Sequence, residues 1–321
     1  MKILRHIENR ALSVTKPALT MGNFDGVHLG HQALLRQVIQ DARAQGGTSV
    51  VLTFEPHPLK ILAPERAPRL ILTHKDKMRL LQSFGVDLAL IQKFDSHFAN
   101  LEAEEFVRSY LVDRIGVRKM WVGRDLRFGK GRKGRAQDLI RWGKEGGFEV
   151  GMVDPVEVVG VRVSSSRIRE LIEKGEVLEA SGYLGRYHFV SGRVVPGNRR
   201  GRHLGFPTAN VVPQTEVVPL DGIYATVFEV GERQWPSVTN VGVNPTFGEG
   251  SRTIESYIFN FSGDLYGEPV RLFFVKRIRE ERKFPSADLL VEQMKKDVFS
   301  ARAILSEIGK GEWAGFAGNS A

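Results

Sequence analysis

The chain has 321 residues, which is long enough for two domains of ordinary size, and it has no cysteine, which excludes disulfide bridges and thiolate–metal sites. A formal net charge of +9 at pH 7 predicts anionic ligands, which are nucleotides, nucleic acid or acidic lipid. No apolar run approaches the roughly 20 residues of a membrane helix, and the N-terminus lacks the apolar core of a signal peptide. The sequence therefore predicts a soluble, cytoplasmic protein.

Strand-like and helical segments alternate from residue 18 to about residue 182. The predicted strands are 18–21, 49–54, 87–91, 119–122 and 148–153, and the predicted helices are 34–42, 75–84, 104–115 and 137–144, with a last helix opening at 167–173. This alternation predicts an α/β domain with a parallel sheet. Ligands of such sheets bind beyond the carboxyl ends of the strands. Residues 22–31, 55–58 and 123–128 all follow strands, so we expect them to share one edge.

The pattern changes near Tyr187, which divides the chain into predicted domains of residues 1–186 and 187–321. The short apolar runs that follow are 189–195, 209–212, 223–230, 237–241, 254–261 and 270–275. Short strands at regular spacing predict a barrel or a sandwich, and residues 230–233 predict a hairpin turn. Apolar residues between 287 and 305 step by three or four, which predicts a long amphipathic helix.

The string GNFDGVHLGH lies between the first predicted strand and helix. His28 and His31 are three residues apart at the start of that helix, so their side chains emerge on one face. The helix start adds unpaired N–H groups and a partial positive charge, and Gly22 and Gly30 allow the backbone to approach a ligand closely. The whole string favours a phosphate site over a helix cap that carries two surface histidines.

The string GRVVPGNRRGRHLGFPTAN ends at Asn210. Its glycines, among them Gly197 and Gly205, and its arginines, among them Arg202, make a flexible cationic loop. Thr208 and Asn210 present two hard oxygens, which suit Mg²⁺. Composition alone supports a phosphate site and a charged surface loop equally. The basic clusters are short of aromatic residues, so small phosphorylated ligands are favoured over nucleic acid.

A third glycine-rich string imitates a dinucleotide fingerprint. Gly129, Gly131 and Gly134 spell G-x-G-x-x-G, and Asp154 follows 20 residues after the third glycine. The preceding strand, however, ends near Gly123 instead of running into the first glycine, and basic residues fill the loop. The sequence therefore disfavours a dehydrogenase.

The first string resembles the HxGH motif of the nucleotidylyltransferase superfamily. Together with TFEPHP and GRDLRFGKGRKG, it resembles the FMN adenylyltransferase module of bacterial FAD synthetases. The resemblance implies that His28 and His31 are catalytic and stabilise charge on the ATP phosphates. It implies that ATP is bound by Gly22, Asn23, Asp25, Gly30, Ser164, Ser165, Ser166 and Arg167. It implies that the flavin is bound by Phe54, His57, Pro58, Asp125 and Phe128.

The second string resembles the PTAN motif of riboflavin kinases. The resemblance implies that Thr208 and Asn210 contact Mg²⁺ and nucleotide phosphate, with Gly197, Arg202 and Gly205 in the same phosphate site. Glu255 stands at the position of that family's catalytic glutamate, where a carboxylate can accept the proton of a primary hydroxyl that attacks a γ-phosphate. Without that role, Glu255 would be a solvent-facing strand residue.

Motifs in the same order cover roughly residues 15–305, so the chain resembles the bacterial bifunctional riboflavin kinase and FAD synthetase family. The resemblance implies a Rossmann-like α/β nucleotidylyltransferase domain, then a small β-barrel with a C-terminal helix. The implied substrates are riboflavin, FMN and ATP, with Mg²⁺ and without nucleic acid or membrane partners; a homo-oligomer stays open. The alternatives are retention of one activity alone, a flavin-binding module without catalysis, and a class I tRNA synthetase-like or RNA-binding protein.

Overall fold

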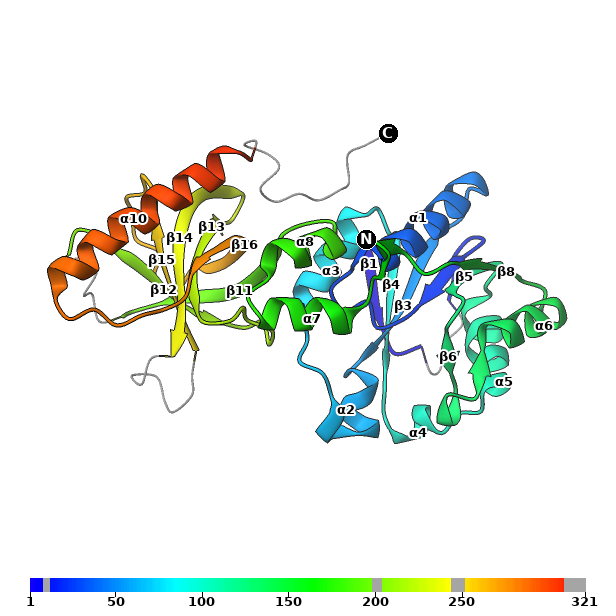
Figure 1. Cartoon of the computed structure of the whole chain (residues 1–321). Helices are drawn as coiled ribbons and strands as arrows, with labels where there is room; N and C mark the ends of the chain where they lie inside the picture. The colour runs from blue at the N-terminus through cyan, green and yellow to red at the C-terminus, as the bar shows by residue number, and fades with distance from the viewer. Residues whose placement is uncertain (8–11, 198–203, 244–251, 309–321) are drawn as a thin grey trace. The chain divides into compact units, whose positions relative to one another are not determined.

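The computed structural model describes residues 1–7, 12–197, 204–243 and 252–308 (Figure 1). The chain divides into two compact units, which are described separately below. The first unit comprises Met1–Arg69 and Lys77–Val163, and the second comprises Leu70–Asp76 and Ser164–Ala321. The predicted domain boundary at residue 187 stays a prediction.

The first unit contains a six-stranded sheet in the order β1-β4-β3-β2-β5-β8. Every neighbouring pair is parallel, which confirms the predicted α/β architecture. The strands are β1 (Lys2–Arg5), β2 (Ala18–Met21), β3 (Ser49–Glu55), β4 (Leu88–Lys93), β5 (Lys119–Gly123) and β8 (Glu149–Val153). The central strands β2 and β3 are almost wholly buried, as expected for a sheet covered on both faces. The sequence analysis missed β1, an edge strand of only four residues.

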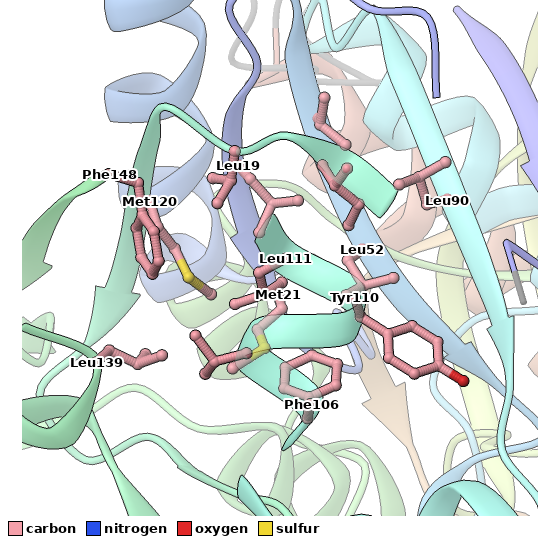
Figure 2. Packing of buried hydrophobic residues seen from close by; sticks show 14 of the residues in the cluster. Leu19, Met21, Leu52, Leu90, Phe106, Tyr110, Leu111, Met120, Leu139 and Phe148 are labelled. Atoms are coloured by element: carbon pink, nitrogen blue, oxygen red, sulfur yellow. The ribbon is translucent and has the colours of Figure 1, made fainter. Parts of the chain in front are cut away.

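Helices cover both faces of this sheet. The helices are α1 (Leu29–Ala44), α2 (Pro58–Leu62), α3 (His74–Ser83), α4 (Ser96–Ala99), α5 (Ala103–Phe106) and α6 (Ala136–Gly146). The helix predicted at 104–115 is instead α5 followed by a π-helical segment, η2 (Val107–Ile115). Apolar side chains of η2 and α6 pack on one face of the sheet (Figure 2). On the other face, Val38 and Ala42 of α1 pack against Ala18.

The second unit is a closed barrel of six antiparallel strands in the order β11-β12-β15-β14-β13-β16, preceded and followed by helices. The strands are β11 (His188–Val195), β12 (Thr208–Pro213), β13 (Gly222–Val230), β14 (Arg233–Val243), β15 (Arg252–Ile258) and β16 (Pro269–Arg279). This result decides between the barrel and the sandwich left open by the sequence. The strand predicted to reach residue 261 ends at Ile258, because Asn260 adopts a left-handed φ of 54°.

The helices of the second unit are α7 (Ser165–Glu173), α8 (Val177–Leu184) and α10 (Ala287–Ser306). The expectation that 167–173 is the last helix before the barrel was wrong. Gly175, with φ of 81°, interrupts the helical backbone, and α8 follows it. Helix α10 packs on β13, β14 and β16, as Figure 1 shows. Arg279 of β16 anchors it through two bonds of 2.9 and 2.7 Å to the buried carboxylate of Asp297.

A buried histidine, His188, is the first residue of the barrel. His188 is 1% exposed, and its Nε2 lies 3.2 Å from the carbonyl oxygen of Val217. Burial and, to a smaller extent, the charge of Arg186 lower the pKa of His188 to about 3, although the Val217 carbonyl opposes the shift. The imidazole is therefore neutral in the folded barrel at neutral pH.

This histidine predicts a stability loss in weak acid. Below pH 6.5 the unfolded chain takes a proton at His188 and the folded barrel does not, so the free energy of unfolding falls as pH drops toward about 3. His188→Gln keeps an N–H near Val217 but cannot titrate. The free energy of unfolding of the variant should therefore fall less steeply with pH, and the two slopes should differ by up to about 1.4 kcal/mol per pH unit. Urea unfolding of both proteins between about pH 4.5 and 8 measures the difference. Parallel stability curves would contradict the prediction.

Candidate active sites

The three segments of the first unit that were expected to share one edge of the sheet do so. Strand β2 pairs with β3 on one side and with β5 on the other, all in parallel. The segments that follow Met21, Glu55 and Gly123 therefore leave the sheet at the same edge. This edge carries the GNFDGVHLGH turn.

The turn has an unusual backbone. Phe24, Gly26 and Val27 have φ values of 51°, 82° and 42°, in the left-handed region. Such conformations cost about 1–3 kcal/mol for each non-glycine residue, so the surroundings must impose them. Phe24 and Val27 are fully buried, and Gln32 Nε2 donates to the Val27 carbonyl at 3.0 Å. Packing and hydrogen bonding thus hold the turn in one shape.

The turn brings the two histidines together at the start of α1. His28 is the N-cap, and its Nδ1 accepts a hydrogen bond from the backbone N–H of His31 at 3.4 Å. The two rings stack with centroids 3.7 Å apart. A Cβ on Gly30 would lie 3.3 Å from the His28 ring, so glycine suits this close approach. Because Nδ1 accepts, the proton of a neutral His28 sits on Nε2, where it can be donated.

Asp25 and a lysine that sequence reasoning missed complete the polar part of the turn. The Nζ of Lys77 donates to the Asn23 carbonyl at 3.1 Å and to Thr53 Oγ1 at 3.2 Å. Burial lowers the pKa of Lys77, while the carboxylates of Asp25 and Glu55 raise it. No motif marks Lys77, because only the packing of α3 brings it under the turn.

The predicted flavin residues Phe54 and Phe128 are half-buried rings of one aromatic cluster. Phe54, near the end of β3, lies 5.7 Å from Phe98, and Phe128 lies 5.8 Å from Phe106 and 6.2 Å from Trp142, between ring centroids. Phe98 and Phe106 join the two, 5.8 Å apart. Packing against neighbouring rings is therefore one reason for aromatic residues at positions 54 and 128.

The other predicted flavin residues lie at turns. His57 caps α2 through Nδ1, which accepts from Leu59 N–H at 3.2 Å, and its Nε2 lies 3.1 Å from the Asn23 amide. Pro58 is the first residue of α2. Asp125 is exposed and forms an ion pair with Arg162. The structure therefore joins His57 to the GNFDGVHLGH turn and pairs Asp125 with Arg162.

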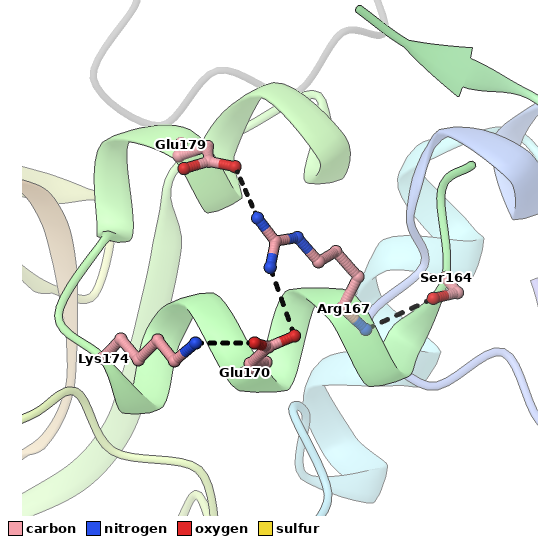
Figure 3. Close-up of polar contacts among 5 residues, drawn as sticks. All are labelled: Ser164, Arg167, Glu170, Lys174 and Glu179. Atoms are coloured by element: carbon pink, nitrogen blue, oxygen red, sulfur yellow. Dashed lines mark hydrogen bonds and ion pairs between the residues drawn. The ribbon is translucent and has the colours of Figure 1, made fainter. Parts of the chain in front are cut away.

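The serine turn belongs to the second unit. Ser164 caps α7, its Oγ accepting from Arg167 N–H at 3.2 Å, and Ser165 and Ser166 form the first turn (Figure 3). The Arg167 guanidinium contacts Glu170 at 3.2 Å and Glu179 at 3.1 Å. The hydroxyl thus performs ordinary capping, and the predicted role of the turn in phosphate binding stays a prediction.

Polar residues of the barrel form a row across three neighbouring strands. Asn210 of β12 pairs in register with Glu255 of β15, which pairs in register with Asn240 of β14. Paired residues lie on one face, about 5 Å apart, and Thr208 lies on that face two residues before Asn210. A Cβ on Gly197 would clash with the Asn210 side-chain amide, so glycine suits that position while Asn210 keeps this conformation.

Asn240 and Glu281 are further candidates to which the sequence analysis assigned no role. The Asn240 Nδ2 donates to a Glu281 carboxylate oxygen at 3.4 Å, and that carboxylate lies against Gly242. The Asn240 Oδ1 is buried and finds no hydrogen-bond partner among the described residues, which costs about 1–3 kcal/mol. A cation or donor of a ligand would satisfy it.

The donor set of this row fits Mg²⁺. It offers a hydroxyl, two amide oxygens and a carboxylate, and Mg²⁺ prefers hard oxygens while keeping several waters and phosphate oxygens. Within the described ranges there is no group of three or more histidine or carboxylate residues that could hold a metal by itself. Arg202 lies outside the described residues, so its predicted part in the phosphate loop is untested.

Comparisons with known proteins match each half of the chain to a known family. Residues 12–167 match the FAD synthetase family model and residues 184–305 match the riboflavin kinase family model, so the chain combines an α/β nucleotidyltransferase-type domain with a barrel kinase domain. The bifunctional riboflavin kinase/FMN adenylyltransferase of Escherichia coli is 38% identical over 304 residues, covering 94% of this chain and 97% of that protein. The protein of the same description from Pseudomonas fluorescens is 38% identical over 306 residues, covering 95% and 98%.

The chain belongs to the family of bifunctional riboflavin kinase/FMN adenylyltransferases. A crystal structure described as a macrolide-efflux protein of Streptococcus pneumoniae is 34% identical, with a TM-score of 0.86, and covers 94% of this chain and 99% of its own. None of the helices in the described ranges combines the length and apolar character that a bilayer crossing requires.

The glycines of the fingerprint-like string have a packing role that mutation can test. A Cβ on Gly134 would lie 2.7 Å from the Ala103 Cβ and 3.0 Å from the Phe128 carbonyl oxygen. Gly134→Ala should therefore destabilise the first unit by about 1–3 kcal/mol through overpacking. Gly182→Ala, in open space on α8, is the matched control and should be neutral or stabilising. Thermal unfolding measures both, and an unchanged midpoint for Gly134→Ala would contradict the packing role.

Proposed function

We propose that this chain makes FAD from riboflavin in two ATP-dependent steps. The barrel unit transfers the γ-phosphoryl group of ATP to riboflavin, which gives FMN and ADP. The α/β unit then joins FMN to the AMP part of a second ATP, which gives FAD and pyrophosphate. The observation that carries the proposal is that each unit has its own polar constellation, the stacked histidines at α1 and the oxygen row on the barrel.

In the kinase step, the barrel residues position and deprotonate the acceptor. Thr208 and Asn210 would hold Mg²⁺, which when bound would neutralise charge on the phosphates. Glu255, between Asn210 and Asn240, accepts the proton of the attacking primary hydroxyl of riboflavin. The Glu255 side chain is half-buried in this row.

In the adenylyl transfer step, the phosphate of FMN attacks the α-phosphorus of ATP and pyrophosphate leaves. His28 and His31 donate to the phosphate oxygens on which charge accumulates, and the N–H groups at the start of α1 add to this. Gly22 and Gly30 let the backbone come close. No covalent enzyme intermediate is required, because positioning and charge stabilisation suffice.

One incubation tests the proposal against its alternatives. The full chain is mixed with riboflavin, ATP and Mg²⁺, and the flavins are separated chromatographically over time. We expect FMN to appear first and FAD afterwards, and chelation of Mg²⁺ to stop FMN formation. Formation of FMN alone, or of FAD only from supplied FMN, would show a single activity. Salt-sensitive RNA binding without flavin chemistry would support the synthetase-like alternative.

The histidine pair predicts a selective loss. His28→Ala removes one donor at the phosphates, so FAD formation from FMN should slow by about 10²–10³-fold, as for a lost oxyanion donor. FMN formation should be nearly unchanged, because it belongs to the other unit. His97→Ala, an exposed histidine of α4, is the control and should leave both rates as they are. Equal loss of both activities in His28→Ala would indicate misfolding instead.

The polar row on the barrel predicts a loss of the kinase step alone. Glu255→Gln keeps the shape of the side chain but removes its basicity, so FMN formation from riboflavin should fall by about 10²–10⁴-fold. FAD formation from supplied FMN should persist in the same preparation. Glu232→Gln, at the exposed β13–β14 hairpin, is the matched control. Near-normal kinase turnover in a folded Glu255→Gln protein would remove Glu255 from the mechanism.

A further inference from the structure

Lys77 lies under the phosphate turn, although it is 46 residues beyond His31 in the sequence. It occupies the first half of α3, and its ammonium reaches the carboxyl ends of β2 and β3. There it donates to the carbonyl of Asn23, the residue after Gly22, and to the hydroxyl of Thr53. Thr53 donates to the same carbonyl at 3.4 Å and is fully buried. The Asn23 carbonyl therefore accepts two donors.

This carbonyl is where the strained part of the turn begins. Phe24 follows it directly in the left-handed region, and Val27, also left-handed, precedes His28. Gln32 holds the far end of the turn through the Val27 carbonyl. Lys77 and Gln32 thus clamp the two ends of the segment that sets the direction of His28. A displacement of about 1 Å at a catalytic group can cost on the order of 10²-fold in rate.

Lys77 also bears on the charge of the turn. Asp25 is 7% exposed and lies within the turn that would face a triphosphate. A buried carboxylate repels phosphate, and the charge of Asp25 raises the pKa of Lys77 against the larger lowering by burial. Glu55, the other carboxylate near Lys77, has Arg5 at 2.6 Å. Lys77 therefore reduces the negative field that Asp25 places on the turn.

We propose that Lys77 is a positioning residue of the adenylyl transfer site, which fixes the turn through the Asn23 carbonyl and offsets the charge of Asp25. This inference rests on the proposed function. It gives Lys77 no contact with the reacting atoms. Its effect should appear in the rate through His28 and in the apparent affinity for ATP through Asp25.

The test uses the full chain and three variants, with kcat and KM for ATP measured in FAD formation from FMN. Lys77→Met should lower kcat by about 10–100-fold and raise KM for ATP, while FMN formation from riboflavin stays within about twofold. Lys77→Arg keeps the charge and should recover a large part of the loss. Lys75→Met removes an exposed lysine from the same helix and should match the wild type.

A double variant isolates the charge effect. Asp25→Asn should change KM for ATP by a different factor in Lys77→Met than in the wild type, so the two substitutions should not be additive. Should Lys77→Met fail to fold, Lys77→Arg and Thr53→Val carry the test, and Thr53→Val should lower kcat by a smaller factor of about 3–10. Wild-type kcat and KM in folded Lys77→Met, or a loss that cooling or a stabilising osmolyte abolishes, would overturn the inference. Absence of FAD formation in the wild type would instead overturn the proposed function.

Discussion

The first unit depends on a backbone constraint at the end of β2. Two buried residues, Phe24 and Val27, must adopt left-handed conformations for the chain to turn from the sheet into α1. Their burial and the clamps from Lys77 and Gln32 offset that strain. The consequence is a helix that begins at His28 with a second imidazole stacked on it. A strained turn at a helix N-terminus is where preorganised phosphate binding is expected.

In the second unit, strands bring the polar side chains together. The interior of the barrel is filled by apolar side chains from all six strands, and the alternation of side chains sends Asn210, Glu255 and Asn240 to the opposite face. Because the barrel is closed, β12, β15 and β14 are neighbours although they are distant in the chain. The closure therefore assembles a site from separated segments and leaves no free sheet edge.

The two units differ in how charge is handled. The α/β unit offers N–H donors, imidazoles and a helix terminus, which are groups that suit negative charge directly. The barrel offers oxygen atoms, which suit a hard cation. The two units thus present chemically distinct sets of polar groups. Both rely on rigid elements, which suits reactions that proceed by positioning without covalent intermediates.

The sequence by itself determined the architecture and the two motif strings, because hydrophobic periodicity, glycine punctuation and helix-start signals are local. It missed β1 and α8, which are short, and it read α5 and η2 as one helix because a π-helical segment keeps nearly the same apolar spacing. Lys77, Asn240 and Glu281 carry no local signal. Only tertiary structure decided their contacts, since it sets which strand lies beside which and which buried side chain reaches a strained carbonyl. Contacts between residues far apart in sequence leave no periodic trace in the chain.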